Sequence, residues 1–505
     1  MTAAYSTPTD MPTTTARKLK TPVRRARSVR PDSDLFGKHK PDPHQEISLA
    51  HADENERVLD FSDPGTGKTP VALWAYAKRR RAGLARCALV FCPRTLTKNV
   101  WANSVRKFTP NYSTVIAKAE NREKAFAEDV DIYITNTDAA KWLAKQKKPF
   151  FARFTDLIID ESSKFKHHTS QRSRALAKIA KHFTARRLLT GTPSSRSITD
   201  VWHQAYVCDD GQRLGNSFYA FRNAVSNPVQ VGRNANAIHW TDKDGAEEAV
   251  FGMLSDIVLR HRFEDVVKIP ERRIYTIEYE MTPKHAKAYF ELEKNQVLLA
   301  MGKNKGGMIS AIHAAALRQK LLQCASGATY LDGIQANKDR PTHIFDTGRY
   351  ELVMDLAEES PHSLVMFLWR HQRDALVQEA EKRNLTYAVM DANTSDTTRE
   401  NIEADYQAGK YDVVIAHPDT VAHGLTFTRG AATIWSSPTD NTEWFKQGNR
   451  RQARRGQTQK TRVVTVIATG TFDERAYDNC VAKGEREDNL LELFAKYTDE
   501  RFVGR

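Results

Sequence analysis

The 505-residue sequence lacks the features of membrane and secreted proteins. No apolar run approaches the roughly 18 residues that cross a bilayer, and the N-terminus has no apolar signal core. The chain has an odd number of cysteines, and they form neither a CxxC pair nor a zinc-binding spacing: Cys87, Cys92, Cys208, Cys324 and Cys480. Such cysteines favour reduced thiols packed in a cytoplasmic protein. We therefore expect a soluble chain with a cytoplasmic location and no membrane partner.

Acidic residues are outnumbered by basic ones. Lys and Arg total 76 against 62 Asp and Glu, which gives a formal net charge of +14. This balance favours a polyanionic partner, either nucleic acid or an anionic membrane surface. Seven Lys or Arg and no acid lie between Arg17 and Arg30. We predict a disordered basic tail over residues 1–34, which is either a solvated tail, a nonspecific phosphate-binding arm or an organellar transit peptide.

Short apolar and β-branched runs alternate with helical patterns in two stretches of the chain. They predict strands within residues 57–61, 88–92, 131–135, 156–160, 186–190, 363–367, 386–390, 412–416, 432–435 and 462–467. This alternation is typical of parallel-sheet α/β units. Between the two stretches, residues 284–301 and 311–324 carry apolar residues at helical spacing. The sequence therefore predicts an α/β fold with two lobes joined by a helical insertion.

The stretch SDPGTGKT, residues 62–69, follows the first predicted strand and precedes a helical pattern. It matches the phosphate-binding P-loop, except that Ser62 stands where the consensus has its first glycine. In a P-loop the lysine reaches the β- and γ-phosphates, and the hydroxyl after it ligates magnesium. We expect these roles for Lys68 and Thr69, with ATP phosphates also bound at Asp63, Gly65, Thr66 and Gly67.

Two later predicted strands also end in polar residues. In DLIIDESS, residues 156–163, Asp160 would hold magnesium and Glu161 would accept the proton of the attacking water. An isolated pair of this kind is usually a solvated turn, but a preceding P-loop favours the catalytic interpretation. In LLTGTP, residues 188–193, Thr190 and Thr192 either form an ordinary turn or couple the nucleotide site to the second lobe.

The stretch QGNRRQARRGQ, residues 447–457, contains four arginines in eleven positions. If it is helical, Arg451 and Arg454 share a face, and both could act as arginine fingers on the γ-phosphate when the lobes close. The alternative is a strip that only grips nucleic acid. Arg450 and Arg455 would project elsewhere and pair with acids or phosphates.

The order of these motifs resembles that of superfamily-two helicases and translocases, and finer matches narrow the resemblance to the Swi/Snf-type branch. Residues 43–45 (PHQ) resemble the segment whose glutamine, here Gln45, contacts adenine. Residues 89–108 resemble the branch's P-x-x-L…W block, and residues 258–289 its interlobe stretch. The arginine-rich stretch aligns without gaps to the closing motif, in which Gln447 is a coupling residue. Residues 191–215 and 417–427 look closest to compact bacteriophage members.

The resemblance covers about residues 35–490 and implies two RecA-like parallel-sheet lobes in tandem. We place lobe 1 at 35–262, the helical insertion and interlobe linker at 263–344, and lobe 2 at 345–505. Gly424 would lie in a flexible turn that couples nucleic acid to the nucleotide. By motif, the nucleic-acid contacts would be Arg94, Thr95, Thr135, Thr137, Trp369 and Arg370.

These observations lead us to expect a magnesium- and ATP-dependent DNA helicase or translocase, working as a monomer. Its partner would be duplex or branched DNA bound with little base specificity, and targeting proteins and the biological pathway stay open. A phage origin would place it in the host cytoplasm. Two alternatives stay open, namely an RNA-directed helicase and a basic architectural DNA-binding protein with a degenerate ATP site. Arg196 and Asp391 depart from the family pattern, which bears on DNA contacts and not on ATP chemistry.

Overall fold

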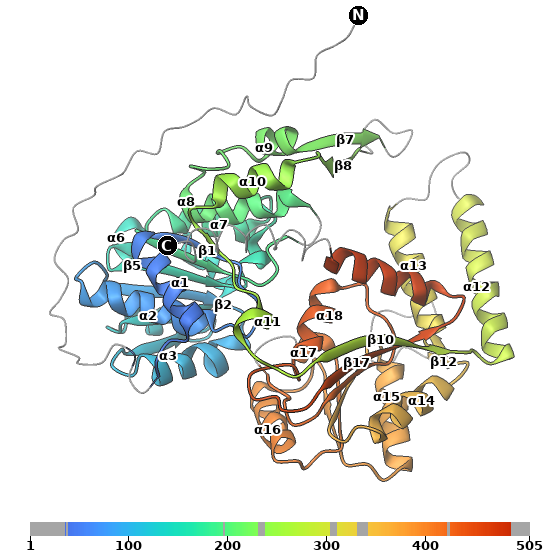
Figure 1. Cartoon of the computed structure of the whole chain (residues 1–505). Helices are drawn as coiled ribbons and strands as arrows, with labels where there is room; N and C mark the ends of the chain where they lie inside the picture. The colour runs from blue at the N-terminus through green and yellow to red at the C-terminus, as the bar shows by residue number, and fades with distance from the viewer. Residues whose placement is uncertain are drawn as a thin grey trace, which may run out of the picture.

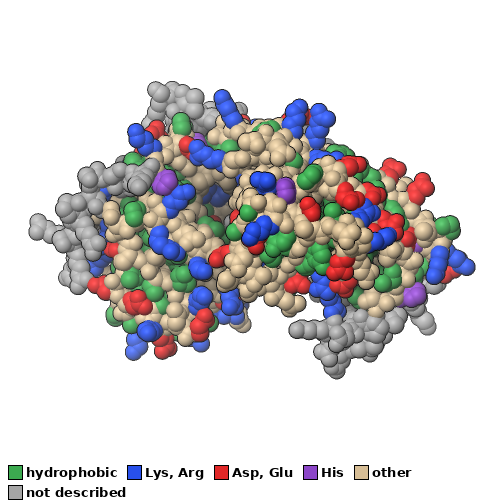
Figure 2. All heavy atoms as spheres, turned by 90° about the horizontal axis from the view of Figure 1, so that it is seen from below, with side chains coloured by type: hydrophobic (Ala, Val, Ile, Leu, Met, Phe, Trp, Pro, Cys, Tyr) green, Lys and Arg blue, Asp and Glu red, His purple; other side chains and the backbone are tan. Residues whose placement is uncertain are grey.

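The computed structural model describes residues 36, 39–194, 197–230, 238–302, 311–330, 342–421 and 425–485. Two large parallel sheets, one of seven and one of six strands, form two lobes that lie side by side (Figure 1). Seen from below, the lobes meet around a hollow that has Lys and Arg side chains on both sides (Figure 2). The predicted fold class of two α/β lobes in tandem is confirmed. The tail at 1–34, Arg196 and Gly424 lie outside the described residues.

Lobe 1 is built on a sheet with the strand order β3-β4-β2-β5-β6-β1-β9, in which every strand pair is parallel. Its strands are β1 Arg57–Asp60, β2 Cys87–Cys92, β3 Thr114–Ala117, β4 Ile132–Asn136, β5 Phe154–Asp160, β6 Ala185–Leu189 and β9 Val258–Leu259. Its helices are α1 Pro43–Glu54, α2 Lys68–Arg81, α3 Asn103–Phe108, α4 Arg122–Ala127, α5 Ala140–Leu143, α6 Lys148–Phe151, α7 Gln171–Ala180, α8 Trp202–Asp209, α9 Phe218–Val225, α10 Ala246–Leu254 and α11 Phe263–Val266. An antiparallel hairpin of β7 Ser226–Gln230 and β8 Ile238–Asp242, which is not among the predicted strands, extends this lobe.

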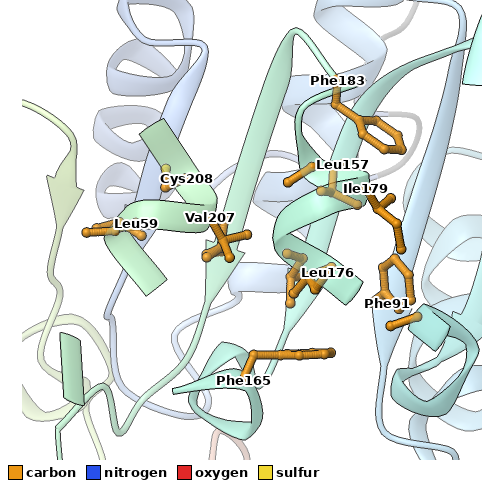
Figure 3. Close-up of a cluster of buried hydrophobic side chains, with 14 of the residues drawn as sticks. Leu59, Phe91, Leu157, Phe165, Leu176, Ile179, Phe183, Val207 and Cys208 are labelled. Atoms are coloured by element: carbon orange, nitrogen blue, oxygen red, sulfur yellow. The ribbon is translucent and has the colours of Figure 1, made fainter. Parts of the chain in front are cut away.

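Alternation along the strands divides the core of lobe 1 between the two faces of the sheet. In β2, Leu89 and Phe91 belong to one buried cluster, whereas Val90 and Cys92 belong to the other. Successive side chains of a strand point to opposite faces, so each face needs its own layer of helices. Figure 3 shows the first cluster, in which side chains of the sheet meet those of α7 and α8. Helices α2 and α3 supply the second cluster.

Lobe 2 is built on a sheet with the order β10-β17-β16-β13-β15-β14, again parallel throughout. Its strands are β10 Arg272–Tyr279, β13 Ser363–Met366, β14 Tyr387–Met390, β15 Val413–Ala416, β16 Ala432–Trp435 and β17 Thr461–Ala468. Its helices are α14 Gly348–Glu358, α15 Arg370–Lys382, α16 Asp396–Gln407, α17 Pro418–Val421 and α18 Thr442–Asn449, and residues 472–485 are also helical. All ten strands predicted from the sequence coincide with observed strands of the two sheets.

The segment placed between the lobes contains more than helices. The predicted helical pair is present as α12 Pro283–Gly302 and α13 Ala311–Ala325, beside a short hairpin of β11 Ala328–Tyr330 and β12 Thr342–Ile344. However, residues 272–279 form the edge strand β10, which pairs with β17 along its whole length. Strand β10 lies at the edge of the sheet, and none of its side chains is fully buried. No helix of the described ranges is long and apolar enough to cross a membrane.

Candidate nucleotide site between the lobes

The predicted nucleotide motifs of lobe 1 emerge side by side from adjacent strands. Strand β6 lies between β1 and β5, and Leu189 pairs with both Asp60 and Asp160. The P-loop follows β1, the acid pair ends β5, and TGTP follows β6. Because the carboxyl ends of parallel strands meet at one edge of a sheet, three distant segments converge there.

The P-loop has the backbone geometry that a phosphate cradle needs. Gly65 and Gly67 have φ values of 93° and 87°, a left-handed conformation that side-chain-bearing residues rarely adopt. Helix α2 begins at Lys68, and no side chain caps its N-terminus. The Lys68 ammonium donates to the carbonyls of Ser62 at 2.5 Å and Asp63 at 3.0 Å. The loop therefore presents the first N–H groups of a helix beside a half-buried cation, which suits a phosphate chain.

The PHQ segment packs directly on this loop. His44 Nε2 lies 2.7 Å from the Thr66 carbonyl, and Gln45 Nε2 donates to the same oxygen at 3.4 Å. A Cβ atom on Gly67 would lie only 2.1 Å from Gln45 Nε2, so the glycine permits this approach. Helix α1 thus places Gln45 at the P-loop, where the resemblance assigns it an adenine contact.

The acid pair lies at the end of β5, where Asp160 is buried and Glu161 is half-buried. Asp160 is 9% exposed, and its Oδ2 atom accepts a hydrogen bond from Trp101 Nε1 at 2.8 Å. Burial raises the pKa of Asp160. Burial, the charge of Asp160 and that of Glu443 together raise the pKa of Glu161 to about 7. The desolvated carboxyls therefore lie where a cation would stabilise their charged forms.

The TGTP segment ties β6 to the other two motifs. Thr192 N donates to Thr190 Oγ1 at 3.2 Å, and Thr190 Oγ1 donates to Ser163 Oγ, just after the acid pair, at 3.4 Å. A Cβ atom on Gly191 would lie 2.6 Å from Pro64 of the P-loop. A shift of any one of the three motifs would therefore displace the other two.

Lobe 2 reaches this site through the segment that follows α18. Arg450 Nη1 lies 3.0 Å from Oδ1 of the P-loop residue Asp63, and Arg455 Nη1 lies 2.8 Å from Asp42 Oδ2. The expectation that Arg450 and Arg455 pair with acids is confirmed, and both acids belong to lobe 1. The next residue, Arg451, is 2% exposed. Burial and the neighbouring charge of Arg454 lower the pKa of Arg451, and the charge of Glu161 opposes them.

The two candidate fingers are not on a helix. Helix α18 ends at Asn449, so the argument that Arg451 and Arg454 share a helical face is wrong. The chain turns here because two glutamine side chains bond to lobe 2. Gln452 Oε1 accepts from Thr433 of β16 at 3.0 Å, and Gln457 Nε2 donates to the Gly430 carbonyl at 2.9 Å.

Each candidate arginine finger forms hydrogen bonds with other residues of lobe 2. Arg451 donates to the carbonyls of Gln447 at 2.9 Å and Leu425 at 3.1 Å. Arg454 donates to Thr426 Oγ1 at 3.0 Å. Burial lowers the pKa of Arg454 to about 10, against the opposing charge of Glu403. Turns and these hydrogen bonds, in place of a helix, fix the position of both guanidiniums.

Comparison with known proteins identifies the family. A family model described as the SNF2-related domain matches residues 49–326, more than half of the chain. The chain belongs to the SNF2-related family. A second model, the helicase conserved C-terminal domain, matches residues 348–456, which contain most of lobe 2. The Swi/Snf-type resemblance inferred from the motifs is confirmed, and the chain has the two-lobed ATPase core of SNF2 proteins.

Relatives of this SNF2-related chain include phage and animal proteins. It is 28% identical over 479 residues to protein p41 of Acyrthosiphon pisum secondary endosymbiont phage 1, covering 90% of the chain and 99% of p41. It is 22% identical to the human SWI/SNF-related matrix-associated actin-dependent regulator of chromatin subfamily A member 1, covering 86% of the chain and 42% of that protein. The chain thus spans less than half the length of this human relative.

Two solved structures of an archaeal SNF2 protein also match. The Sulfolobus solfataricus SWI2/SNF2 ATPase core in complex with dsDNA has a TM-score of 0.42 and 19% identity, over 92% of this chain and 97% of that one. A second structure, of the Sulfolobus solfataricus SWI2/SNF2 ATPase core domain, has a TM-score of 0.42 and 18% identity, over 89% of this chain and 90% of that one.

The predicted nucleic-acid residues of the SNF2 chain differ in their exposure. Arg94 and Arg370 are exposed, and Thr95 and Trp369 are half-buried. Thr137 is 7% exposed. Thr135 is fully buried, and its hydroxyl donates to the Ala117 carbonyl at 2.8 Å, so it does not reach the surface in this structure.

Several residues of the SNF2 site are not predicted from the sequence motifs. They act as partners of motif residues: Trp101 on Asp160, Arg260 on Asp63, Glu403 beside Arg454 and Glu443 beside Glu161. Gln447, predicted to couple the lobes, donates to Glu443 at 3.2 Å. Trp101 is the tryptophan of the P-x-x-L…W block at residues 89–108, and this match is the sequence signal that could have pointed to it.

Proposed function

We propose that this SNF2-family chain is a DNA-stimulated ATPase that closes its lobes around ATP and thereby moves on or remodels duplex DNA. The observation that carries the proposal is the approach of the lobe-2 arginine segment to the P-loop and the acid pair of lobe 1. Arg450 Nη1 lies 3.0 Å from Asp63 of the P-loop, and the buried Arg451 is its neighbour in the chain. One nucleotide would then contact groups from both lobes, so hydrolysis would depend on the distance between them.

The residues support a division of roles in hydrolysis. Lys68 and the N-terminus of α2 bind the phosphates, and Gln45 lies at the adenine end. Glu161 accepts the proton of the attacking water. Arg451 and Arg454 compensate the charge that develops on the γ-phosphate oxygens. Magnesium, held by Thr69 and Asp160, would neutralise phosphate charge in this site. Desolvation raises the pKa of both acids, and a cation at this place would lower it again by stabilising the carboxylates.

A nucleic-acid partner is supported by charge and by relatives. The net charge of +14 favours a polyanion. A Danio rerio relative, 20% identical over 460 residues, bears the name chromodomain-helicase-DNA-binding protein 1-like. Lys and Arg side chains also line both sides of the hollow between the lobes (Figure 2). Contacts by such side chains would read the backbone and give steep salt dependence with little base specificity.

The test is ATP turnover by the purified chain with duplex DNA, single-stranded DNA, RNA or no nucleic acid, at several salt concentrations. We expect the largest stimulation with duplex DNA, a decline with salt, and loss of turnover in Lys68→Ala. Turnover absent under every condition, or unaffected by Lys68→Ala, would refute the proposal. Preferential stimulation by RNA would favour the RNA-directed alternative, and a strand-displacement assay separates unwinding from translocation.

A further inference from the structure

Asp63 connects more of the molecule than any phosphate-binding role requires. Its carboxylate accepts hydrogen bonds from Arg260 Nη1 at 2.8 Å and from the Phe263 backbone N–H at 3.0 Å, and Arg450 Nη1 lies 3.0 Å away. Its carbonyl accepts from Lys68 Nζ at 3.0 Å. One P-loop residue therefore touches the phosphate-binding lysine, the chain that leaves β9 toward lobe 2, and lobe 2 itself.

The Asp63–Arg450 contact is shielded from solvent. The Asp63 side chain is 4% exposed and that of Arg450 is 15% exposed. Although burial opposes it, Arg450 and Arg260 hold the pKa of Asp63 well below its ordinary value, so the carboxylate stays ionised. A shielded charge pair of this kind constrains geometry more than an exposed one.

The Asp63–Arg450 contact affects Arg451 because the two arginines are adjacent in the chain. Arg450 directly precedes Arg451, and the turn that contains both is bonded to lobe 2 through Gln452. Consecutive Cα atoms are about 3.8 Å apart, so the backbone of Arg451 must follow that of Arg450. Fixing Arg450 on the P-loop therefore fixes how far Arg451 reaches into the cleft.

We propose that Asp63 and Arg450 form a docking pair that positions the Arg451 guanidinium over the γ-phosphate. Arg450 is a positioning residue that acts through its neighbour. The inference rests on the proposed function and adds a specific residue pair that sets how lobe closure delivers the finger. The charged P-loop side chain, and not only the nucleotide, guides the second lobe into register.

Arg455 provides a matched control. It also pairs with an acid of lobe 1, because Arg455 Nη1 lies 2.8 Å from Asp42, but its side chain is 74% exposed. If any ion pair between the lobes sufficed, Arg455→Gln and Arg450→Gln would have similar effects. We expect Arg455→Gln to keep ATP turnover within about twofold, because exposed ion pairs contribute little.

The test measures kcat and KM for ATP with saturating duplex DNA for Arg450→Gln, Arg450→Lys and Arg455→Gln. Asp63 keeps Arg260 in the Arg450 variants, so no buried charge is left alone. Arg450 also borders a cavity of about 320 Å³ beside Phe445 and Tyr477, so a shorter side chain leaves no sealed void. We expect Arg450→Gln to lower kcat about tenfold at an unchanged KM, and Arg450→Lys to restore most of it.

A double-mutant cycle separates positioning from a structural role. Asp63→Asn also removes the ion pair with Arg260, so it should be the worse single variant. Adding Arg450→Gln to it should lower kcat no further, because the Asp63–Arg450 contact is already lost. Multiplicative losses, or an Arg450→Gln variant with wild-type kcat, would overturn the inference while an active wild type and an inactive Lys68→Ala leave the proposed function intact. An inactive wild type would instead refute the proposed function, and the inference with it.

Discussion

Glu161→Gln is predicted to stabilise the nucleotide-free protein at pH 8 while removing its ATPase activity. The half-buried side chain loses part of its hydration, and this desolvation together with the charges of Asp160 and Glu443 raises its pKa to about 7 from the ordinary 4.5. Glutamine has nearly the same shape and cannot ionise. The substitution therefore removes the cost of a buried charge together with the group proposed to accept the proton of water.

The sign and size of the stability effect follow from the pKa shift. Below pH 4.5 the glutamic acid is neutral in both the folded and unfolded chain, so its ionisation does not affect stability. Between pH 4.5 and about 7 the unfolded chain ionises first, and wild-type stability falls relative to the glutamine variant. Above pH 7 the difference levels off at about 3 kcal/mol, since each pKa unit corresponds to roughly 1.4 kcal/mol.

The assay is urea unfolding of wild type and Glu161→Gln at pH 5 and pH 8, without nucleotide or magnesium. We expect the variant to be more stable by up to about 3 kcal/mol at pH 8 and by clearly less at pH 5. ATP turnover with duplex DNA should fall at least about a hundredfold. The same stability difference at both pH values would refute the assignment of a raised pKa to Glu161.

Two further substitutions test contacts behind the site. Gly191→Ala places a Cβ atom 2.6 Å from Pro64, so the P-loop must shift, and KM for ATP should rise about tenfold. Gly252→Ala, where a Cβ atom meets nothing within 4 Å, is its control and should leave kcat and KM unchanged. An unchanged KM in Gly191→Ala would contradict the packing of TGTP on the P-loop. Trp101→Phe removes the 2.8 Å hydrogen bond to Asp160, so the pKa of that acid should rise further, and about tenfold more magnesium should be needed for half-maximal turnover. An unchanged magnesium requirement would contradict the role of Asp160 as a ligand.

The sheets could be predicted from sequence because their central strands are buried on both faces. Such strands read as continuous apolar runs, as in residues 88–92 and 412–416. The same reasoning missed the edge strand β10 and the two-residue β9, where edge position and brevity remove that signal. It also missed the hairpin of β7 and β8, whose residues beyond Ser226 are largely exposed.

The residues of the site also differ in whether the sequence predicts them. Some site residues can be predicted from one short stretch of sequence. Lys68 follows the glycines of the P-loop motif, and Asp160 ends a predicted strand. Contacts between distant segments cannot be predicted in this way. Nothing in the sequence around Asp63 indicates Arg450 as its partner, because the pairing depends on how two complete lobes meet. The helix expected for Arg451 and Arg454 failed for the same reason, since hydrogen bonds of Gln452 and Gln457 to the lobe determine that turn.

The most direct test of a site shared by two lobes is single-turnover ATP hydrolysis by Arg451→Ala, with ATP binding measured separately on the same protein. The account predicts ATP affinity within a few-fold of wild type and hydrolysis slower by about a thousandfold, because this lobe-2 guanidinium acts on the transition state. Hydrolysis at the wild-type rate would contradict it.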